Sequence, residues 1–502
     1  MRGTIAAIFT AFTMHHKAQI LDRRITPLLP YWPGRGPIAH MNHDDLNHWS
    51  KRAADWARDY HAGLRDQPVR APVKPGETAA KLPAFAPESA EPMEQIFADF
   101  ESIVPGATTH WQHPRFFAYF PANASPASML AEQLANAIAG QAMLWQTAPA
   151  ANEIEAVMIN WLRDALGLPD GFTGTIHDSA TTTTLAAILT MRERVLDWQG
   201  NKQGLSALPQ LRLYASGETH SSIDKAARIA GIGQDNLVKI PTNADHQMDT
   251  GALDAAITSD LAAGFLPAGV IACVGGTSIG ASDDIAATVA VAKTHDLYVH
   301  VDAAWAGSAM ICPEYRHIWA GVEGADSIVF NPHKWLGAQF DCAVQFLKNP
   351  AEQINTLGLR PEYLNTLGQD EITNYNEWTV PLGRRFRALK LWFTLRAYGL
   401  EGLRDRIRNH INWARECHDT IAKMDRFEIT TAPAFSLFTF RYKESDAETE
   451  ALLTRINDDG RIYLTQTRQN GKFVIRMQVG QFDCTREDVM MVPTVLNNLT
   501  GG

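Results

Sequence analysis

Four side chains of different chemistry stand directly after short apolar runs in the middle of this sequence. They are an imidazole, a hydroxyl, a carboxylate and an amine, carried by His220, Thr277, Asp302 and Lys334. Such a set can bind a charged ligand and move protons, and the amine can bond covalently to a carbonyl carbon. Whether the four act together depends on the elements that position them.

The runs that precede these side chains have the length and composition of buried strands. They cover 211–216 ("LRLYAS"), 269–274 ("GVIACV"), 297–307 ("LYVHVDAAWAG", whose β-rich part ends at Asp302) and 327–330 ("SIVF"). From about residue 126 such runs alternate with helical patterns, which indicates an α/β domain with a largely parallel sheet. Parallel strands end at one edge of the sheet, where ligands of open α/β folds bind. We therefore expect the four side chains to converge at that edge.

The segment 174–196 ("GTIHDSATTTTLAAILTMRERVL") adds a candidate anion site. A turn rich in hydroxyls precedes a helix, and the open amides at a helix N-terminus bind phosphate. Ser179, Ala180 and Thr181 lie where those amides would point. A plain Ser/Thr helix cap is the alternative interpretation. The sequence has neither a Walker-type lysine here nor a dinucleotide glycine fingerprint, so nucleotide cofactors are poorly supported.

A phosphate site, an amine and a carboxylate at one sheet edge point to pyridoxal phosphate. The amine of Lys334 can form a Schiff base with the cofactor aldehyde, and Asp302 can keep the pyridine nitrogen protonated, which makes the ring an electron sink. His220 can stack on the ring. Each residue alone also has an ordinary explanation: a surface lysine, a turn-capping aspartate and a core histidine. The combination, in this order along the chain, favours the cofactor.

Composition excludes several other classes. The 502 residues, 45% of them hydrophobic and 20% charged, are typical of a globular protein with two or three structural units. A formal net charge of -10 without a basic run argues against nucleic-acid binding. The five cysteines are scattered without metal-ligand spacing, which fits a reducing cytoplasm and predicts no metal site. No apolar stretch has the length of a membrane span.

The first forty residues differ from the rest of the chain. They are basic and poor in acids, so they are either a targeting segment or an upstream extension of the reading frame. Met41 opens a pattern in which Asn42 can cap an amphipathic helix. From Gln67 to Pro92 frequent prolines indicate an extended connector.

Four sequence blocks carry a family resemblance that runs from about Met41 to about residue 495. They read "HWQHPRFFAYFP", "HVDAAWAGSAMICPEYRH", "NPHKW" and "VPLGRRFRALKLWFTLRAYGLEGL". In register over the chain, they resemble the pyridoxal-phosphate-dependent aromatic-L-amino-acid decarboxylases of the group II decarboxylase family. The resemblance implies a cytoplasmic homodimer of fold type I, the PLP-dependent transferase-like fold, with active sites at the subunit interface.

The resemblance also implies a domain plan. Residues 1–40 lie outside it, 41–125 form an N-terminal helical arm, and 126–390 form a large cofactor-binding domain with a mostly parallel seven-stranded sheet. Residues 391–502 form a small C-terminal α+β domain. The amphipathic pattern after Met41 fits an arm helix that needs a partner surface.

Site residues follow from the resemblance position by position. Lys334 matches the Schiff-base lysine, Asp302 the partner of the pyridine nitrogen and His220 the ring-stacking histidine. Ala304 should lie against the opposite ring face, and Thr277 matches a cofactor-contacting threonine. The phosphate-binding positions are matched by Ala180, Thr181, Asn331 and His333.

The resemblance further assigns a proton donor and a substrate pocket. Tyr363, in a polar, glycine-punctuated segment, matches a tyrosine on a mobile loop that protonates the substrate carbon after carbon dioxide leaves. His220 matches a possible relay for that proton. The apolar and aromatic wall suits an aromatic side chain, and its members are Trp111, Tyr119, Phe120, Pro121, Gln141 and Met143.

Five positions depart from the family's usual pattern. Asp178 places a carboxylate beside the expected phosphate, which is unfavourable unless it points away or is paired. Asn376 stands where a basic residue is common, and Trp305 replaces a tyrosine. Gln141 and Met143 replace more apolar or aromatic residues, so the preference among tryptophan, tyrosine, dihydroxyphenylalanine and phenylalanine is open.

Three functions remain distinguishable by experiment. The favoured function is decarboxylation of an aromatic L-amino acid to an arylalkylamine. An aromatic aldehyde synthase on the same fold would release peroxide, but such relatives replace the loop tyrosine or the stacking histidine, and this chain keeps Tyr363 and His220. A catalytically silent cofactor-binding protein is the third function, and retention of Lys334 and Tyr363 speaks against it.

Overall fold

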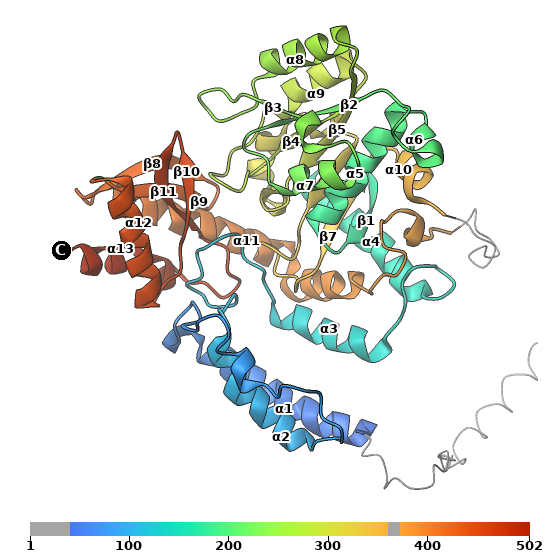
Figure 1. Ribbon diagram of the computed structural model, residues 1–502. Coiled ribbons are helices and arrows are strands. Elements are labelled where there is room, and N and C mark those ends of the chain that lie inside the picture. Colours follow the sequence, from blue (N-terminus) through green and yellow to red (C-terminus); the bar gives the residue numbers. More distant parts are fainter. Residues whose placement is uncertain (1–40, 360–371, 502) are drawn as a thin grey trace, which may run out of the picture.

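A seven-stranded sheet forms the centre of the molecule in the computed structural model, which describes residues 41–359 and 372–501 (Figure 1). The strand order is β1-β7-β6-β5-β4-β2-β3. Neighbours from β3 to β6 run parallel, whereas β7 is antiparallel to both β6 and β1. The strands are β1 (Thr173–His177), β2 (Leu211–Ser216), β3 (Leu237–Ile240), β4 (Leu266–Cys273), β5 (Tyr298–Asp302), β6 (Ser327–Phe330) and β7 (Ala343–Leu347). The predicted mostly parallel sheet is confirmed.

The apolar runs that precede the candidate site residues are these strands. β2 and β6 have the predicted bounds, β5 begins one residue later than predicted, and β4 begins earlier, at Leu266. In register, Cys273 at the end of β4 is opposite Asp302, and Asp302 is opposite Val329 of β6. The ends of β4, β5 and β6 therefore lie side by side, which places the residues after them at one edge.

Helices cover the sheet, and this burial explains why its central strands are mostly apolar. α5 packs against β4 to β7, and α8 and α9 pack against β4. All residues of β5 and β6 are buried. The helices of this region are α3 (Pro126–Ile138), α4 (Pro149–Leu166), α5 (Ala180–Val195), α6 (Gln199–Gln203), α7 (Ser222–Ile229), α8 (Thr250–Ala262), α9 (Ile285–Thr294) and α10 (Pro350–Leu357).

A second, antiparallel sheet lies in the C-terminal part of the chain, with the order β10-β11-β9-β8 (Figure 1). Its strands are β8 (Phe427–Ala434), β9 (Leu437–Tyr442), β10 (Thr465–Gln469) and β11 (Lys472–Gln478). It packs against α11 (Ala388–Ala422), α12 (Asp446–Asp459) and α13 (Arg486–Thr500). The predicted boundary near residue 390 falls inside α11, whose backbone leaves the helical conformation at Gly399, where φ is +63°. The division into domains stays a prediction.

Two N-terminal helices, α1 (His43–Ala62) and α2 (Met93–Ile103), project from the body of the molecule (Figure 1). The predicted cap is confirmed: Asn42 Oδ1 accepts hydrogen bonds from the amides of Asp44 and Asp45 at 2.8 and 3.0 Å. The helices meet through aromatic rings, with Trp56 and Phe100 centroids 4.9 Å apart. Neither helix has a buried residue. The predictions for residues 1–40 lie outside the described residues.

The segment between the two arm helices has little regular structure, as its prolines predicted. Only short helical turns occur there, at Leu64–Asp66 and Ala79–Lys81. Among the helices of the described residues, none is long and apolar enough to cross a membrane.

Candidate active site

A cavity of about 310 Å³ lies where the parallel strands end. His220 follows β2, Thr277 follows β4, Asp302 ends β5, and Lys334 follows β6. The predicted residues that line this cavity are Phe120, Ala180, Thr181, His220, Thr277, Asp302, Ala304, Asn331 and Lys334. The convergence expected from the strand pattern is therefore present in the structure.

Lys334 is held in the cavity wall with its Nζ 5.1 Å from the centroid of the Phe120 ring. Desolvation by the surrounding protein lowers the pKa of Lys334 to about 8. The charge of Asp302 opposes this effect, and the charge of Arg476 adds to it. An ordinary lysine has a pKa near 10.4, so near neutral pH Lys334 has a much larger neutral, nucleophilic fraction.

Asp302 is fixed by the turn that ends β5. Its Oδ1 accepts a hydrogen bond from the amide of Ala304 at 3.0 Å, and the carbonyl of Ala304 accepts one from the amide of Asn331 at 2.8 Å. The turn after β5 is thereby connected to the turn after β6. One side chain of this connection, Asn331, is buried, and its Oδ1 has no hydrogen-bond partner within residues 41–359 and 372–501.

The hydrogen bonds of His220 define its tautomer. Nδ1 accepts a hydrogen bond from the amide of Ser222 at 3.1 Å and lies 2.8 Å from Ser222 Oγ. Burial lowers the pKa of His220, Asp302 opposes that effect, and Lys334 adds to it. The imidazole is therefore assigned as neutral with its proton on Nε2.

The turn before α5 combines a helix cap with a wall of the cavity. Ser179 Oγ accepts a hydrogen bond from the amide of Thr182 at 3.2 Å, so Ser179 is the cap of α5. Ser179, Ala180 and Thr181 also line the cavity. The helix cap is therefore confirmed, and the phosphate site stays a prediction that the positive end of α5, facing the cavity, supports.

Asp178 does not line the cavity. Its Oδ1 accepts a hydrogen bond from the amide of Ser179 at 2.7 Å. The residue instead lines a separate cavity of about 180 Å³ together with Arg384 and Arg387. The carboxylate therefore points away from the predicted phosphate position.

Aromatic rings close the cavity on the side of Phe120. Phe120 stacks on Trp305 with centroids 4.4 Å apart, and Trp305 stacks on Trp335 at 4.9 Å. Trp305 also lines the cavity and is 1% exposed. The tryptophan that replaces the family's usual tyrosine is thus a wall of the site.

The phosphate contact of His333 stays a prediction. It is buried, but it does not line the cavity within this chain. Its Nδ1 accepts a hydrogen bond from the amide of Cys342 at 2.9 Å, and its ring contacts Phe340 at 4.8 Å. Burial lowers the pKa of His333 to about 3, so the ring is neutral and structural here.

The predicted substrate wall is only partly assembled within one chain. Trp111 and Tyr119 stack on each other at 5.8 Å but do not line the cavity, and neither does Pro121. Gln141 Oε1 accepts a hydrogen bond from the amide of Arg384 at 2.6 Å, away from the cavity lining. Of the predicted wall, Phe120 alone lines the cavity.

Met143 contacts Asn376, which also departs from the family pattern. Its carbonyl accepts a hydrogen bond from the amide of Asn376 at 3.1 Å. The buried Asn376 has no hydrogen-bond partner for its Oδ1 among the residues that the structure describes. Tyr363, the predicted proton donor, lies outside the described residues.

Several cavity residues were missed by sequence reasoning. They are Ser222, Cys273, Gly275, Gly276 and Phe340. Ser222 had a signal, because a hydroxyl two residues after a histidine can bond its Nδ1. No sequence signal identified Gly276. A Cβ there would come 2.8 Å from the carbonyl oxygen of Glu218, which is a contact between segments far apart in the sequence.

Arg476 was also missed, and it reaches the site from β11 of the second sheet. Its Nε donates to the carbonyl of Thr277 and a terminal nitrogen donates to that of Tyr119, each at 2.8 Å. The other terminal nitrogen has no partner among the described residues. The guanidinium lies 4.8 Å from the Phe120 ring centroid. Burial lowers the pKa of Arg476 to about 9.

The donor set of the cavity fits pyridoxal phosphate. An amine of lowered pKa suits its aldehyde, a fixed carboxylate suits its pyridine nitrogen, and a helix N-terminus suits its phosphate. The unpartnered, buried Asn331 Oδ1 marks a polar position that a ligand or water would satisfy. Lys334, Asp302 and the amides at Ala180 and Thr181 would hold the cofactor.

Comparisons with known proteins agree with this site. The family described as pyridoxal-dependent decarboxylase conserved domain matches residues 75–443. The chain is 39% identical to the aromatic-L-amino-acid decarboxylase of Sus scrofa, over 89% of this chain and 93% of that protein.

Two solved structures show the same fold over nearly the whole chain. Oryza sativa TDC with PLP and tryptamine superposes with a TM-score of 0.89 at 34% identity and covers 93% of this chain and 99% of its own. Rhodiola rosea 4-hydroxyphenylacetaldehyde synthase superposes with a TM-score of 0.85 at 33% identity, with coverages of 92% and 98%.

Proposed function

The chain belongs to the pyridoxal-dependent decarboxylase family, and we propose that it converts an aromatic L-amino acid into the corresponding arylalkylamine and carbon dioxide. The observation that carries this proposal is the single cavity in which Lys334, Asp302 and His220 meet the aromatic ring of Phe120. The substrate candidates are tryptophan, tyrosine, dihydroxyphenylalanine and phenylalanine. The named relatives support this class of substrate.

The groups of this chain divide the work of binding. Lys334 supplies a nitrogen that is readily neutral, because its pKa is lowered to about 8. The N-terminus of α5, capped by Ser179, supplies amides for the phosphate. Asp302, fixed by the Ala304 amide, supplies a negative charge at a constant position. Bound pyridoxal phosphate supplies an electron-withdrawing ring that accepts the electrons left when carbon dioxide departs.

His220 is positioned to handle a proton. Ser222 occupies its Nδ1, so the Nε2–H remains to donate in the cavity. Because burial lowers the pKa of His220, the ring stays neutral and does not add a second positive charge beside Lys334. Phe120, backed by Trp305, offers an apolar surface to an aromatic side chain and excludes water from that side.

An aldehyde synthase is the alternative, since one of the structural relatives carries that name. Such relatives typically replace the loop tyrosine or the stacking histidine, and this sequence keeps both Tyr363 and His220. One assay separates the two activities: carbon dioxide, amine, aldehyde and peroxide are measured together across a panel of aromatic L-amino acids. We expect equal molar amounts of amine and carbon dioxide, and no peroxide. Peroxide equal to carbon dioxide would replace the proposal with the synthase activity.

We also propose that the chain acts as a homodimer with the two sites at the subunit interface. α3 exposes an apolar stripe at helical spacing, with Leu130, Leu134 and Ile138 at 51%, 43% and 64% exposure. Gln141 and Met143 follow this helix, so a partner packed on the stripe would bring its own copies towards the cavity of the first chain. The arm helices, which bury no residue, would pack on the same partner. Sedimentation at micromolar concentration should give twice the chain mass of 55.5 kDa.

A cytoplasmic location and the four-part domain plan complete the proposal. All five cysteines are free and buried, which suits a reducing compartment. Limited proteolysis that cuts between the arm and residue 126, and again near Gly399, would support the plan. Fractionation of cells that make the full chain would test the location.

A further inference from the structure

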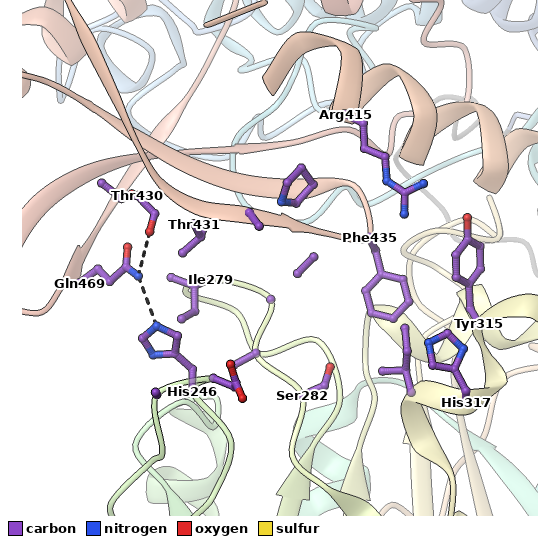
Figure 2. A pocket seen from close by; sticks show the side chains of 18 residues that line it. His246, Ile279, Ser282, Tyr315, His317, Arg415, Thr430, Thr431, Phe435 and Gln469 are labelled. Atoms are coloured by element: carbon purple, nitrogen blue, oxygen red, sulfur yellow. Dashed lines mark hydrogen bonds between the residues drawn. The ribbon is translucent and has the colours of Figure 1, made fainter. Parts of the chain in front are cut away.

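A second and larger pocket lies between the two sheets, outside the site described above. Its volume is about 560 Å³, and its walls come from β8, the loop after β4, the segment before α8 and the turn around Tyr315. Figure 2 shows the side chains of this pocket, with Phe435 and Ile279 facing its interior. It shares no lining residue with the cofactor cavity, so it is a separate place for a ligand.

One end of this interdomain pocket carries a spare positive charge. Arg415, on α11, points towards Tyr315 and Phe435 (Figure 2). It forms no ion pair or hydrogen bond with the described residues, although Arg408 on the same helix pairs with Glu314 at 2.6 Å. His317 stands beside Tyr315 at this end. A ligand group that binds here is therefore an anion.

The polar groups at the opposite end are already occupied. Gln469 Nε2 lies 3.4 Å from both His246 Nε2 and the Thr430 carbonyl oxygen, as Figure 2 shows. Asp245, the one carboxylate of the lining, directly precedes His246 in the sequence. Within the described residues, the pocket thus has an unpaired positive charge at one end and hydrogen-bonded polar groups at the other.

The middle of the pocket is apolar. Ile279, Ile318, Pro433 and Phe435 line it. The Phe435 ring forms T-shaped contacts with two neighbouring rings. Its centroid lies 6.0 Å from that of Tyr315 and 5.8 Å from that of Trp305. A flat ring fits such a wall better than a flexible chain does.

We propose that the interdomain pocket is a binding site for a small aromatic carboxylate, and that the cofactor cavity senses its occupancy. The carboxylate pairs with Arg415, and the ring lies against Phe435. The site does not depend on which amino acid the enzyme decarboxylates.

The loop after β4 connects the two places physically. Gly275, Gly276 and Thr277 line the cofactor cavity, whereas Ile279 to Ser282 line the interdomain pocket. The loop is cross-braced, because the Gly276 amide donates to the Ala281 carbonyl at 2.7 Å and the Gly275 amide donates to Ser282 Oγ at 3.0 Å. A displacement on one side is therefore transmitted to the other.

Two glycines hold this loop against its neighbours on both sides. A Cβ at Gly275 (φ +77°) would come 2.4 Å from the Cβ of Ala306, and one at Gly280 (φ +80°) would come 2.6 Å from the Cβ of Ala434. At these two positions the loop backbone packs closely against the segments that carry Ala306 and Ala434. A second connection runs from Phe435 through Trp305 to Phe120, the ring beside Lys334 Nζ.

The test uses the cofactor-loaded enzyme and phenylacetate as the probe, with binding measured by isothermal titration calorimetry. Arg415→Met should weaken binding about tenfold or more, because a hydrogen-bonded charge pair is lost. Ala432→Trp, at an exposed position of β8 in the lining, should fill the pocket and abolish binding. Arg396→Met is the matched control, because Arg396 is an exposed arginine of the same helix outside the lining, and it should bind like wild type.

Equal affinity of wild type, Arg415→Met and Ala432→Trp would place the probe in the cofactor cavity and overturn the proposal, as would absence of binding to wild type. Phenylacetamide, which lacks the charge, should bind about tenfold more weakly than phenylacetate. The coupling is tested by the same titration on cofactor-free enzyme. We expect the affinity to differ by about fivefold or more between the two forms, and equal affinities would overturn the coupling.

Discussion

The two sheets contribute to the cofactor cavity in different ways. The large, mostly parallel sheet delivers His220, Asp302 and Lys334 from the ends of β2, β5 and β6. The C-terminal antiparallel sheet delivers one buried guanidinium, Arg476, which bonds backbone carbonyls around the cavity. The large sheet therefore provides the reacting groups, while the second sheet braces the wall and adjusts the charge. Substitutions in the two sheets should therefore have effects of different kinds and of different sizes on turnover and on the pKa of Lys334.

The largest effect is expected in the parallel sheet, at Lys334. Lys334→Ala removes the one amino group that lines the cavity. Formation of the arylalkylamine product should then fall by about 1000-fold or more. The truncated side chain lies at a cavity wall, so the far-ultraviolet circular dichroism and the thermal transition should persist. Steady-state amine release and a melting curve on the same sample give both results. Wild-type turnover would remove Lys334 from the mechanism.

Asp302→Asn should cost about 100-fold in turnover, because a fixed charge that stabilises the protonated pyridine nitrogen is lost. The same substitution should lower the pKa of Lys334 below about 8, because the charge of Asp302 opposes the lowering. Reductive methylation of cofactor-free protein at several pH values, read on the Lys334 peptide by mass spectrometry, measures this pKa. Only the neutral amine reacts, so labelling rises with pH through the pKa.

Arg476→Met, in the second sheet, should shift the same labelling curve in the opposite direction. The charge of Arg476 lowers the pKa of Lys334, so its removal should move the curve to higher pH. The neutral fraction at pH 7 then falls, and cofactor capture by the apoenzyme slows by a few-fold. Opposite shifts in the two variants support separate electrostatic roles for the two sheets. Shifts of the same sign would contradict them.

The smallest catalytic effect is expected at Phe435, at the end of β8. Phe435→Leu loses ring contacts with Trp305 and Trp335, and it should lower the free energy of unfolding by about 1–2 kcal/mol. Turnover in saturating substrate should stay within about threefold of wild type, because Phe435 does not line the cofactor cavity. Urea unfolding and steady-state kinetics measure the two quantities. A loss of turnover without a loss of stability would give the second sheet a direct catalytic role.

The features that the sequence alone predicted, in the site and in the fold, are those governed by local rules. Lys334 and Asp302 were found because parallel strands end at one edge, and Asn42 because helix caps depend on adjacent residues. Arg476 was missed because it reaches the cavity from a different sheet, 142 residues after Lys334, through backbone contacts that no local pattern encodes. His333 faces Phe340 and the Cys342 amide because its own turn folds back on itself.

The family resemblance predicted site residues that no local rule could identify, but the single chain brings only some of them to the cavity. It placed Phe120 correctly at the cavity, but Gln141 and Met143 lie beside Arg384 and Asn376 in the single chain. A wall shared between subunits cannot be assembled from one chain, which is why the dimer is part of the proposed function.

The most direct test of the central claim is the position of the cofactor bond. Holoenzyme is treated with borohydride, which fixes the bond between the cofactor aldehyde carbon and the nitrogen that holds it, and the digest is sequenced by mass spectrometry. We predict a phosphopyridoxyl group on Lys334, in the peptide that contains Asn331 and Trp335, and none in Lys334→Ala. A cofactor bound to another lysine, or an unmodified Lys334 in an enzyme that still releases carbon dioxide, would contradict the account.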